Sequence, residues 1–130
     1  MIILSLRTDK EQAEVGLHEN NMRLGYIKWP AHRTLSKTIL LKIKIILDES
    51  SISLTQVQGI VVFAGPGSFT GLRIGLSVAN ALAGSLGVPI VARSGKNWLK
   101  RGTADLQDGQ NDKIALPEYG QAARTTSPRK

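Results

Sequence analysis

The sequence predicts an α/β fold, with helices packed on a mixed five-stranded sheet and elements in the order β-β-β-α-β-α-β. Three observations support this prediction. Three short strand patterns open the chain, a helix pattern follows them, and strand, helix and strand patterns then alternate. A strand, a helix and a second strand in succession form a parallel crossover unit, so the sheet combines antiparallel and parallel pairs.

The first three strands are predicted from the alternation of side chains. Residues 2–7 begin apolar on both faces, as a central strand does. Residues 13–18 and 22–29 alternate apolar and polar side chains, which is typical of half-buried strands. Short polar turns separate the three segments, and Asn20 suits a positive φ. These features predict an antiparallel meander.

The helix predicted at 34–47 is apolar on more than one side. Its main stripe consists of Leu35, Ile39, Ile43 and Ile46. Leu40, Leu41, Ile45 and Leu47 widen this stripe beyond that of an ordinary half-buried helix. Such a helix needs two surfaces to pack on. One is the sheet, and the other is either a neighbouring helix or a second protein chain.

A glycine-rich loop, Gly65-Pro66-Gly67-Ser68-Phe69-Thr70-Gly71, joins a strand at 57–64 to a helix at about 70–86. Ser68 or Thr70 suits the N-cap, and Gly87 suits a left-handed C-terminal residue. A strand at 88–92 follows. Three antiparallel strands followed by parallel α/β units are the order of the ribonuclease-H-like fold and of each half of actin-like ATPases.

The regular pattern ends after Ser94. We therefore expect one domain over residues 1–95 and a vestigial second lobe or basic flexible tail over residues 96–130. A short helix start is expected at 94–99, and residues 102–112 are polar, with glycine and aspartate interrupting the pattern. Residues 114–119 are apolar enough to dock on the domain, and 120–130 are expected to be disordered.

Composition limits the possible classes of function. The 130 residues include no cysteine, which excludes disulfides and thiolate metal sites, and the net charge is +7. Residues 74–92 are uncharged, but their polar and glycine content favours a buried helix and strand over a membrane span. No secretory signal is visible, so we expect a cytoplasmic protein. Residues 93–130 contain eight basic and four acidic residues, which suits acidic partners such as RNA. A solvated basic surface with a loose tail is the favoured explanation, because no aromatic interleaving or RNA-binding signature accompanies the charge.

The glycine-rich loop matches neither common nucleotide motif. It lacks the Gly-Lys-Ser/Thr of a Walker A loop, and its glycine spacing differs from the dinucleotide fingerprint. A vestigial anion site at Gly67, Ser68, Phe69 and Arg73 is one interpretation. The simpler one starts from the spacing of four residues between Gly71, Gly75, Ala79 and Ala83, which gives the helix a stripe of small residues that another backbone can approach.

No residue pattern indicates catalysis or metal binding. His18 and His32 lie 14 positions apart in different expected elements, and neither has a carboxylate at ligand spacing. Each is interpreted as a lone surface or helix-start histidine. We expect no metal and no cofactor.

The residues Gly65 to Gly75, GPGSFTGLRIG, resemble the signature of the TsaB (YeaZ) family. The resemblance covers residues 1 to about 95, and Pro117-Glu118-Tyr119 is similar to a Pro-x-Tyr near the family's C-terminus. Two departures are notable. The family's first strand usually ends Asp-Thr-Ser, where this chain has Arg7-Thr8-Asp9, and only some 35 residues follow the first lobe. Both argue against independent ATP hydrolysis.

The resemblance implies a non-catalytic scaffold. Such a subunit binds the catalytic subunit TsaD and, with the ATPase TsaE, helps form N6-threonylcarbamoyladenosine at position 37 of tRNAs reading ANN codons. The chain then reaches tRNA indirectly and forms a homodimer when alone. The family's pairing uses the two helices of the first lobe. The predicted interface therefore consists of Leu35, Ile39, Ile43, Ile46, Gly71, Leu72, Gly75, Ala79 and Ala83.

Two other classes of function stay open on the sequence alone. One is a small basic RNA-binding module that uses residues 93–130. The other is an actin-like nucleotide-binding enzyme, which the cation Arg7 disfavours.

Overall fold

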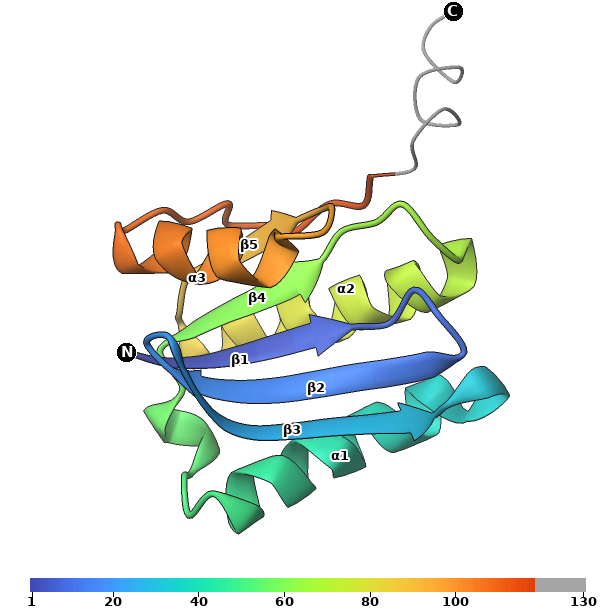
Figure 1. Cartoon of the computed structure of the whole chain (residues 1–130), viewed down its shortest axis with the longest axis horizontal. Coiled ribbons are helices and arrows are strands. Elements are labelled where there is room, and N and C mark those ends of the chain that lie inside the picture. Colours follow the sequence, from blue (N-terminus) through green and yellow to red (C-terminus); the bar gives the residue numbers. More distant parts are fainter. Residues whose placement is uncertain (119–130) are drawn as a thin grey trace, which may run out of the picture.

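A computed structural model describes residues 1–118, and the expected disorder of 120–130 lies outside this range. The strands are β1 (Ile2–Arg7), β2 (Gln12–Glu19), β3 (Met22–Pro30), β4 (Gly59–Phe63) and β5 (Ile90–Arg93). The helices are α1 (Leu35–Glu49), α2 (Phe69–Leu86) and α3 (Trp98–Gln107), with 3-10 turns at His32–Thr34 and Leu54–Gln56. The predicted order of the first seven elements is confirmed (Figure 1).

The sheet has the strand order β3-β2-β1-β4-β5. β2 pairs antiparallel with both β1 and β3, whereas β4 pairs parallel with β1 and β5. The sheet is therefore mixed, and β1 is its central strand, as the apolar start of the chain predicts.

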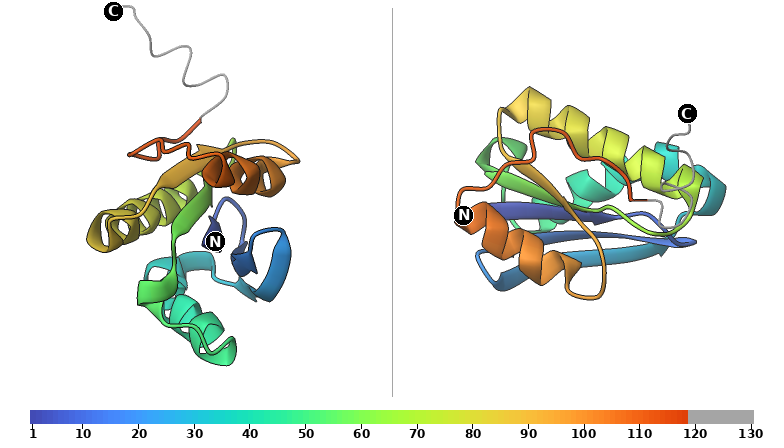
Figure 2. Two further views of the ribbon diagram at one scale, coloured as in Figure 1. Left: turned by 90° about the vertical axis from the view of Figure 1, so that its left-hand side faces the viewer. Right: turned by 90° about the horizontal axis from the view of Figure 1, so that it is seen from above.

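Helices cover both faces of the sheet (Figure 2). α1 and α2 pack on one face, where α1 contacts β2 and β3 and α2 contacts β4 and β1. α3 packs on the opposite face against β4 and β5, where Leu106 lies against Gly59 and the backbone of Gly102 lies close to Val61. The part of this second face formed by β2 and β3 has no helix over it among the described residues.

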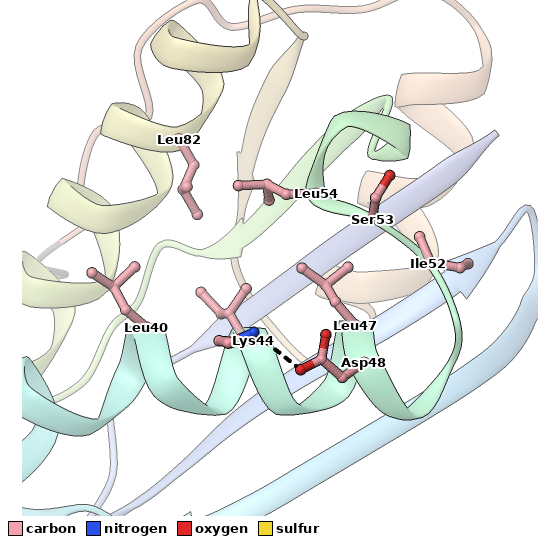
Figure 3. Close-up of a pocket in the computed structure, with 9 residues that line it drawn as sticks. Leu40, Lys44, Leu47, Asp48, Ile52, Ser53, Leu54 and Leu82 are labelled. Atoms are coloured by element: carbon pink, nitrogen blue, oxygen red, sulfur yellow. Dashed lines mark hydrogen bonds and ion pairs between the residues drawn. The ribbon is translucent and has the colours of Figure 1, made fainter.

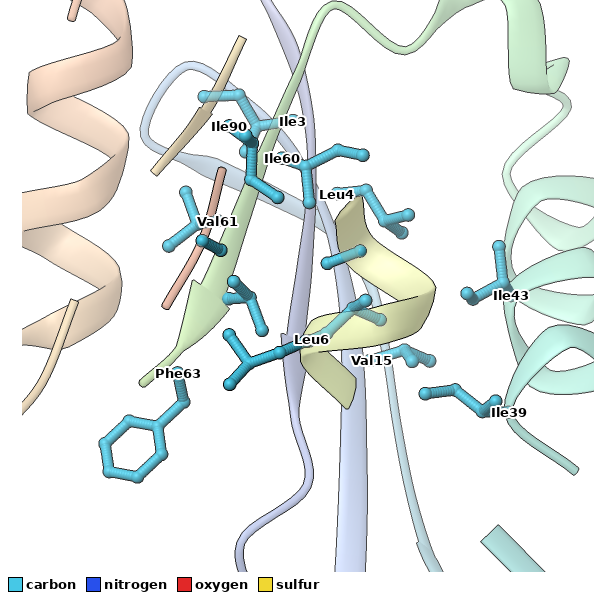
Figure 4. Packing of buried hydrophobic residues seen from close by; sticks show 14 of the residues in the cluster. Ile3, Leu4, Leu6, Val15, Ile39, Ile43, Ile60, Val61, Phe63 and Ile90 are labelled. Atoms are coloured by element: carbon cyan, nitrogen blue, oxygen red, sulfur yellow. The ribbon is translucent and has the colours of Figure 1, made fainter. Parts of the chain in front are cut away.

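A single apolar core fills the space between the sheet and the helices (Figure 4). Its largest fully buried side chains include Leu4 and Leu6 of β1, Ile60 of β4, Ile39 and Ile46 of α1, and Leu72 of α2. Burial of such side chains is the main favourable contribution to folding. The core also includes Trp98, Leu106 and Ala115.

The flexible-tail alternative does not hold for residues 98–118, which pack on the rest of the chain, whereas the boundary at residue 95 and the alternative of a vestigial second lobe stay predictions. α3 continues to Gln107 because its buried side chains and Gly102 complete the second face of the sheet, and this tertiary packing outweighs a polar local sequence.

Residues 108–118 cross the edge of the sheet beside β5. The Asn111 carboxamide oxygen accepts a hydrogen bond from the Ile90 N–H at 3.1 Å. The Asp112 carboxylate accepts one from the Ala92 N–H at 2.8 Å. The Asn80 side chain makes two hydrogen bonds with the backbone of Ala115. The expectation that residues from 114 onward dock on the domain is confirmed as far as Glu118, and Tyr119 lies outside the described residues.

The expected helix caps of α2 are confirmed. Ser68 is the N-cap, and its Oγ accepts from the Gly71 N–H at 3.5 Å. Gly87 ends the helix with a φ of 68°, a conformation that glycine adopts without strain.

Candidate protein-interaction surface

The glycine-rich loop packs against the end of β1. The Thr8 hydroxyl donates to the Gly71 carbonyl at 2.7 Å, and the Ser68 N–H donates to the Asp9 carbonyl at 3.1 Å. A Cβ at Gly71 would overlap the Thr8 carbonyl oxygen, and one at Gly75 would overlap the Thr8 hydroxyl. These glycines therefore serve the close approach of α2 to β1 within the chain.

The proposed anion site has little room for an anion. The Ser68 N–H is already bonded, and the Asp9 side chain lies against the backbone of Gly67. Arg73 is exposed and lies over the Phe69 ring, 5.3 Å from its centroid. The Asp9 carboxylate would also repel an anion bound at this position.

Arg7 is held by its own neighbours. Its Nε donates to the Asp9 carboxylate at 2.8 Å, and its guanidinium carbon lies 4.0 Å from the centroid of the Phe63 ring. Asp9 itself is buried. The cation thus neutralises a buried carboxylate at this end of the sheet.

The residues predicted as the partner interface face the core of the chain itself. Eight of the nine, all except Gly71, are buried, and Ile39, Leu72 and Ala79 have no exposed surface. In the single chain these side chains pack inward, and their assignment to a partner interface stays a prediction. The apolar stripe of α1 and the small-residue stripe of α2 are the sides that pack on the sheet and on Thr8.

Other apolar side chains of these two helices, and Leu54 of the 3-10 turn that follows α1, point outward or into the seam between the helices. We call this set the α1–α2 surface: Leu40, Leu41, Leu54, Ile74, Val78 and Leu82. Leu40 and Leu41 of α1 are 56% and 53% exposed. Ile74, Val78 and Leu82 are half-buried at a spacing of four on α2.

Two depressions, each of about 410 Å³, lie along the seam. In the first, Leu40, Leu54 and Leu82 surround an apolar hollow, with the exposed Lys44–Asp48 ion pair at its rim (Figure 3). Ile74 and Val78 line the second, together with polar residues of both helices. A solvent-exposed ion pair of this kind contributes less than about 1 kcal/mol to stability, so the apolar side chains dominate the energetics of the surface.

The outer side of α2 is smooth. Ser77, Ala81 and Ser85 are exposed at a spacing of four, beside the row of Ile74, Val78 and Leu82. Small residues next to an apolar row let another helix approach closely. The sequence contained this signal, but the more regular stripe of Gly71, Gly75, Ala79 and Ala83 obscured it.

The two histidines differ in their surroundings. His32 begins the turn before α1 and is exposed, as predicted. His18 is buried, which contradicts its interpretation as a surface residue, and its Nε2 lies 3.0 Å from the Ser5 hydroxyl. Burial and the nearby Arg23 cation lower the His18 pKa to about 4.

Residues 1–118 contain no group of three metal-ligating side chains, and none of their helices is long and apolar enough to cross a membrane.

Known proteins are similar to this chain in sequence and in fold. The family model TsaD, tRNA N6-adenosine threonylcarbamoyltransferase, matches residues 25–95. The TsaB protein of Haemophilus influenzae, a tRNA threonylcarbamoyladenosine biosynthesis protein, is 32% identical over 116 residues, which are 89% of this chain and 49% of that protein. The Escherichia coli TsaB protein is 34% identical over 95 residues, 72% of this chain and 40% of that protein.

The solved structure of YeaZ from Pseudomonas aeruginosa is similar, with a TM-score of 0.69 and 30% identity over 83% of this chain and 50% of that chain. This likeness confirms the predicted actin-like, ribonuclease-H-like fold. The chain spans about half the length of the relatives it matches. From the family model, the sequence relatives and the shared fold together, the chain belongs to the TsaB (YeaZ) family of tRNA threonylcarbamoyladenosine biosynthesis proteins.

Proposed function

We propose that this chain is a non-catalytic scaffold subunit that binds a TsaD-type catalytic subunit through the α1–α2 surface. The observation behind this proposal is the pair of depressions between α1 and α2, whose apolar lining includes side chains that stay exposed, such as Leu40 and Leu54, and others that are only half-buried. Exposed apolar surface of this kind marks a protein interaction site.

The geometry of the surface suits two further helices. A helix pair from a partner can place its apolar side chains in the two depressions while its backbone approaches Ser77 and Ala81. The result is an intermolecular four-helix bundle. A second copy of this chain presents the same surface, so the chain forms a homodimer when the catalytic subunit is absent. TsaE joins the larger complex, and this chain contacts tRNA indirectly, through the complex.

The surroundings of Arg7 support a role without independent catalysis. The position where an actin-like enzyme needs a carboxylate holds a cation, and its ion pair with Asp9 occupies the end of β1. The alternative RNA-binding module built on 93–130 also loses one of its cations, because Arg93 forms ion pairs with Asp105 and Asp112.

Reconstitution with a TsaD-type subunit, TsaE and unmodified tRNA tests the proposal. We expect the chain to bind the TsaD-type subunit in analytical ultracentrifugation and to increase the yield of threonylcarbamoyladenosine. The double variant Leu40→Asp, Val78→Asp places two carboxylates on the α1–α2 surface. Affinity should fall about tenfold to 100-fold, because charged groups replace apolar anchors at the centre of the interface.

The matched control is the double variant Ile114→Asp, Leu116→Asp, which introduces the same two charges at apolar residues that are 64% and 68% exposed and lie outside α1 and α2. This variant should bind like the unmodified chain. Equal affinity for all three proteins, or equal loss in both variants, would reject the α1–α2 surface as the binding site.

A further inference from the structure

A second concave surface lies on the opposite face of the sheet. It is a groove of about 620 Å³ between α3 and the β2–β3 hairpin. We call it the basic groove, and its polar lining includes Arg23, Lys96, Lys100, Asn20, Asn97 and Gln107. Residues from two segments far apart in the sequence, 18–23 and 96–107, thus meet around one hollow.

The groove exists because α3 covers only part of its sheet face. α3 packs mainly on β4 and β5, and within residues 1–118 most of β2 and β3 has no helix over it on this side. Ser5 of β1 and His18 of β2 form a hydrogen-bonded pair on this face, and His18 also lines the groove. The exposed part of the face is polar, in contrast to the apolar face under α1 and α2.

The charge of the groove is of one sign. Arg23, Lys96 and Lys100 line it, and no carboxylate does. Within residues 1–118, these three cations form no ion pair, whereas Arg7 and Arg93 each pair with an aspartate. Arg23 is held against the Tyr26 ring, 4.3 Å from its centroid. Three unpaired cations around one hollow attract an anionic ligand.

The remaining lining indicates which kind of anion fits. Carboxamides of Asn20, Asn21, Asn97 and Gln107 can both donate and accept hydrogen bonds. Leu99 and Ala104 are the apolar residues in the lining, so the groove lacks the apolar floor that a lipid chain or an amphipathic helix requires. Cations for phosphates and amides for hydroxyls and base edges are the usual contacts to RNA.

We propose that the basic groove binds the sugar-phosphate backbone of RNA. The groove and the α1–α2 surface lie on opposite faces of the sheet, so both can be occupied at once. RNA binding by the groove is independent of the proposed function, and only the identification of the RNA as a tRNA rests on it. In that case the chain holds part of the tRNA directly, which goes beyond an indirect role.

Binding of a fluorescently labelled, unmodified tRNA to the full chain tests this proposal over a series of salt concentrations. The groove variant is Lys96→Gln, Lys100→Gln, and the matched control is Lys10→Gln, Lys37→Gln, which removes two exposed lysines elsewhere. All changes leave residues 119–130 intact. At about 0.1 M salt we expect the groove variant to bind tRNA about tenfold more weakly. The slope of the logarithm of the binding constant against the logarithm of the salt concentration should fall by about two, which corresponds to the loss of two phosphate contacts.

The control variant should keep both its affinity and its salt dependence. An equal loss in both variants would show a general charge effect and overturn the proposal, as would an unchanged groove variant. A polyglutamate chain at matched charge should compete poorly with the tRNA. Equal competition would indicate an acidic protein segment as the ligand in place of RNA. Loss of tRNA binding with normal binding to the TsaD-type subunit separates this site from the α1–α2 surface.

Discussion

Gly71→Ala is expected to lower the free energy of unfolding by about 3 kcal/mol or more. The added Cβ would overlap the carbonyl oxygen of Thr8, a backbone atom that cannot move aside without shifting the end of β1. The hydrogen bond from the Thr8 hydroxyl to the Gly71 carbonyl would be lost with it. Overpacking of a fixed backbone contact is among the most destabilising kinds of substitution. Urea unfolding followed by circular dichroism measures the effect.

Gly84→Ala in the same helix is the matched control. A Cβ at Gly84 has no atom within 4 Å, and the residue is exposed in the last turns of α2. Because alanine is the better helix former, this variant should be about 0.5–1 kcal/mol more stable than the unmodified chain. The opposite signs distinguish contact with Thr8 from a general effect of glycine replacement. Two variants of equal stability would contradict the close approach of α2 to β1.

The fold was predictable where local signals and tertiary packing agree. The period of two over β2 and β3, and the caps Ser68 and Gly87 of α2, gave the same element types in sequence and structure. α3 was missed because its sequence is polar and contains Gly102, which is unfavourable inside an isolated helix. Its stability comes from contacts with β4 and β5 that a local pattern does not reveal.

The interaction surface was predictable only to the level of the helices. The sequence showed that α1 has more apolar side chains than one packing face requires, and the exposure of Leu40 and Leu41 agrees with this. It did not show which stripe faces the sheet, because both stripes have helical spacing. On α2, the stripe that faces the sheet is decided by Thr8, which lies 63 positions before Gly71 in the sequence. Thr8 lies so close to α2 that a Cβ at Gly71 or at Gly75 would overlap it.

His18 shows the same limit for a titratable group. Alternation along β2 places its side chain on one face of the sheet, but burial depends on what lies over that face. α3 and the loop before it, which were expected to be a tail, supply part of this cover. The consequence is chemical, because a buried imidazole is held in its neutral form.

Stability is therefore expected to fall as the pH drops from about 6.5 to about 4. The unfolded chain protonates His18 near its ordinary pKa of 6.5, whereas the folded chain does so only near 4. Between these values the unfolded state binds more protons, so acid favours unfolding. The stabilisation is complete above pH 6.5, and a difference of this size corresponds to at most about 3 kcal/mol lost by pH 4.

Urea unfolding at pH 7, 6, 5 and 4 measures this dependence, and the variant His18→Gln isolates its cause. Glutamine can keep a hydrogen bond to Ser5 but does not titrate, so its stability should change much less between pH 6.5 and 5, above the range where most carboxylates titrate. His32→Gln is the control, because this residue is exposed on the turn before α1 and its removal leaves the effect of His18 in place. If the unmodified chain and His18→Gln lost stability in parallel over this interval, a group other than His18 would be responsible. A buried neutral imidazole against Ser5 would then not be what limits the acid stability of this sheet face.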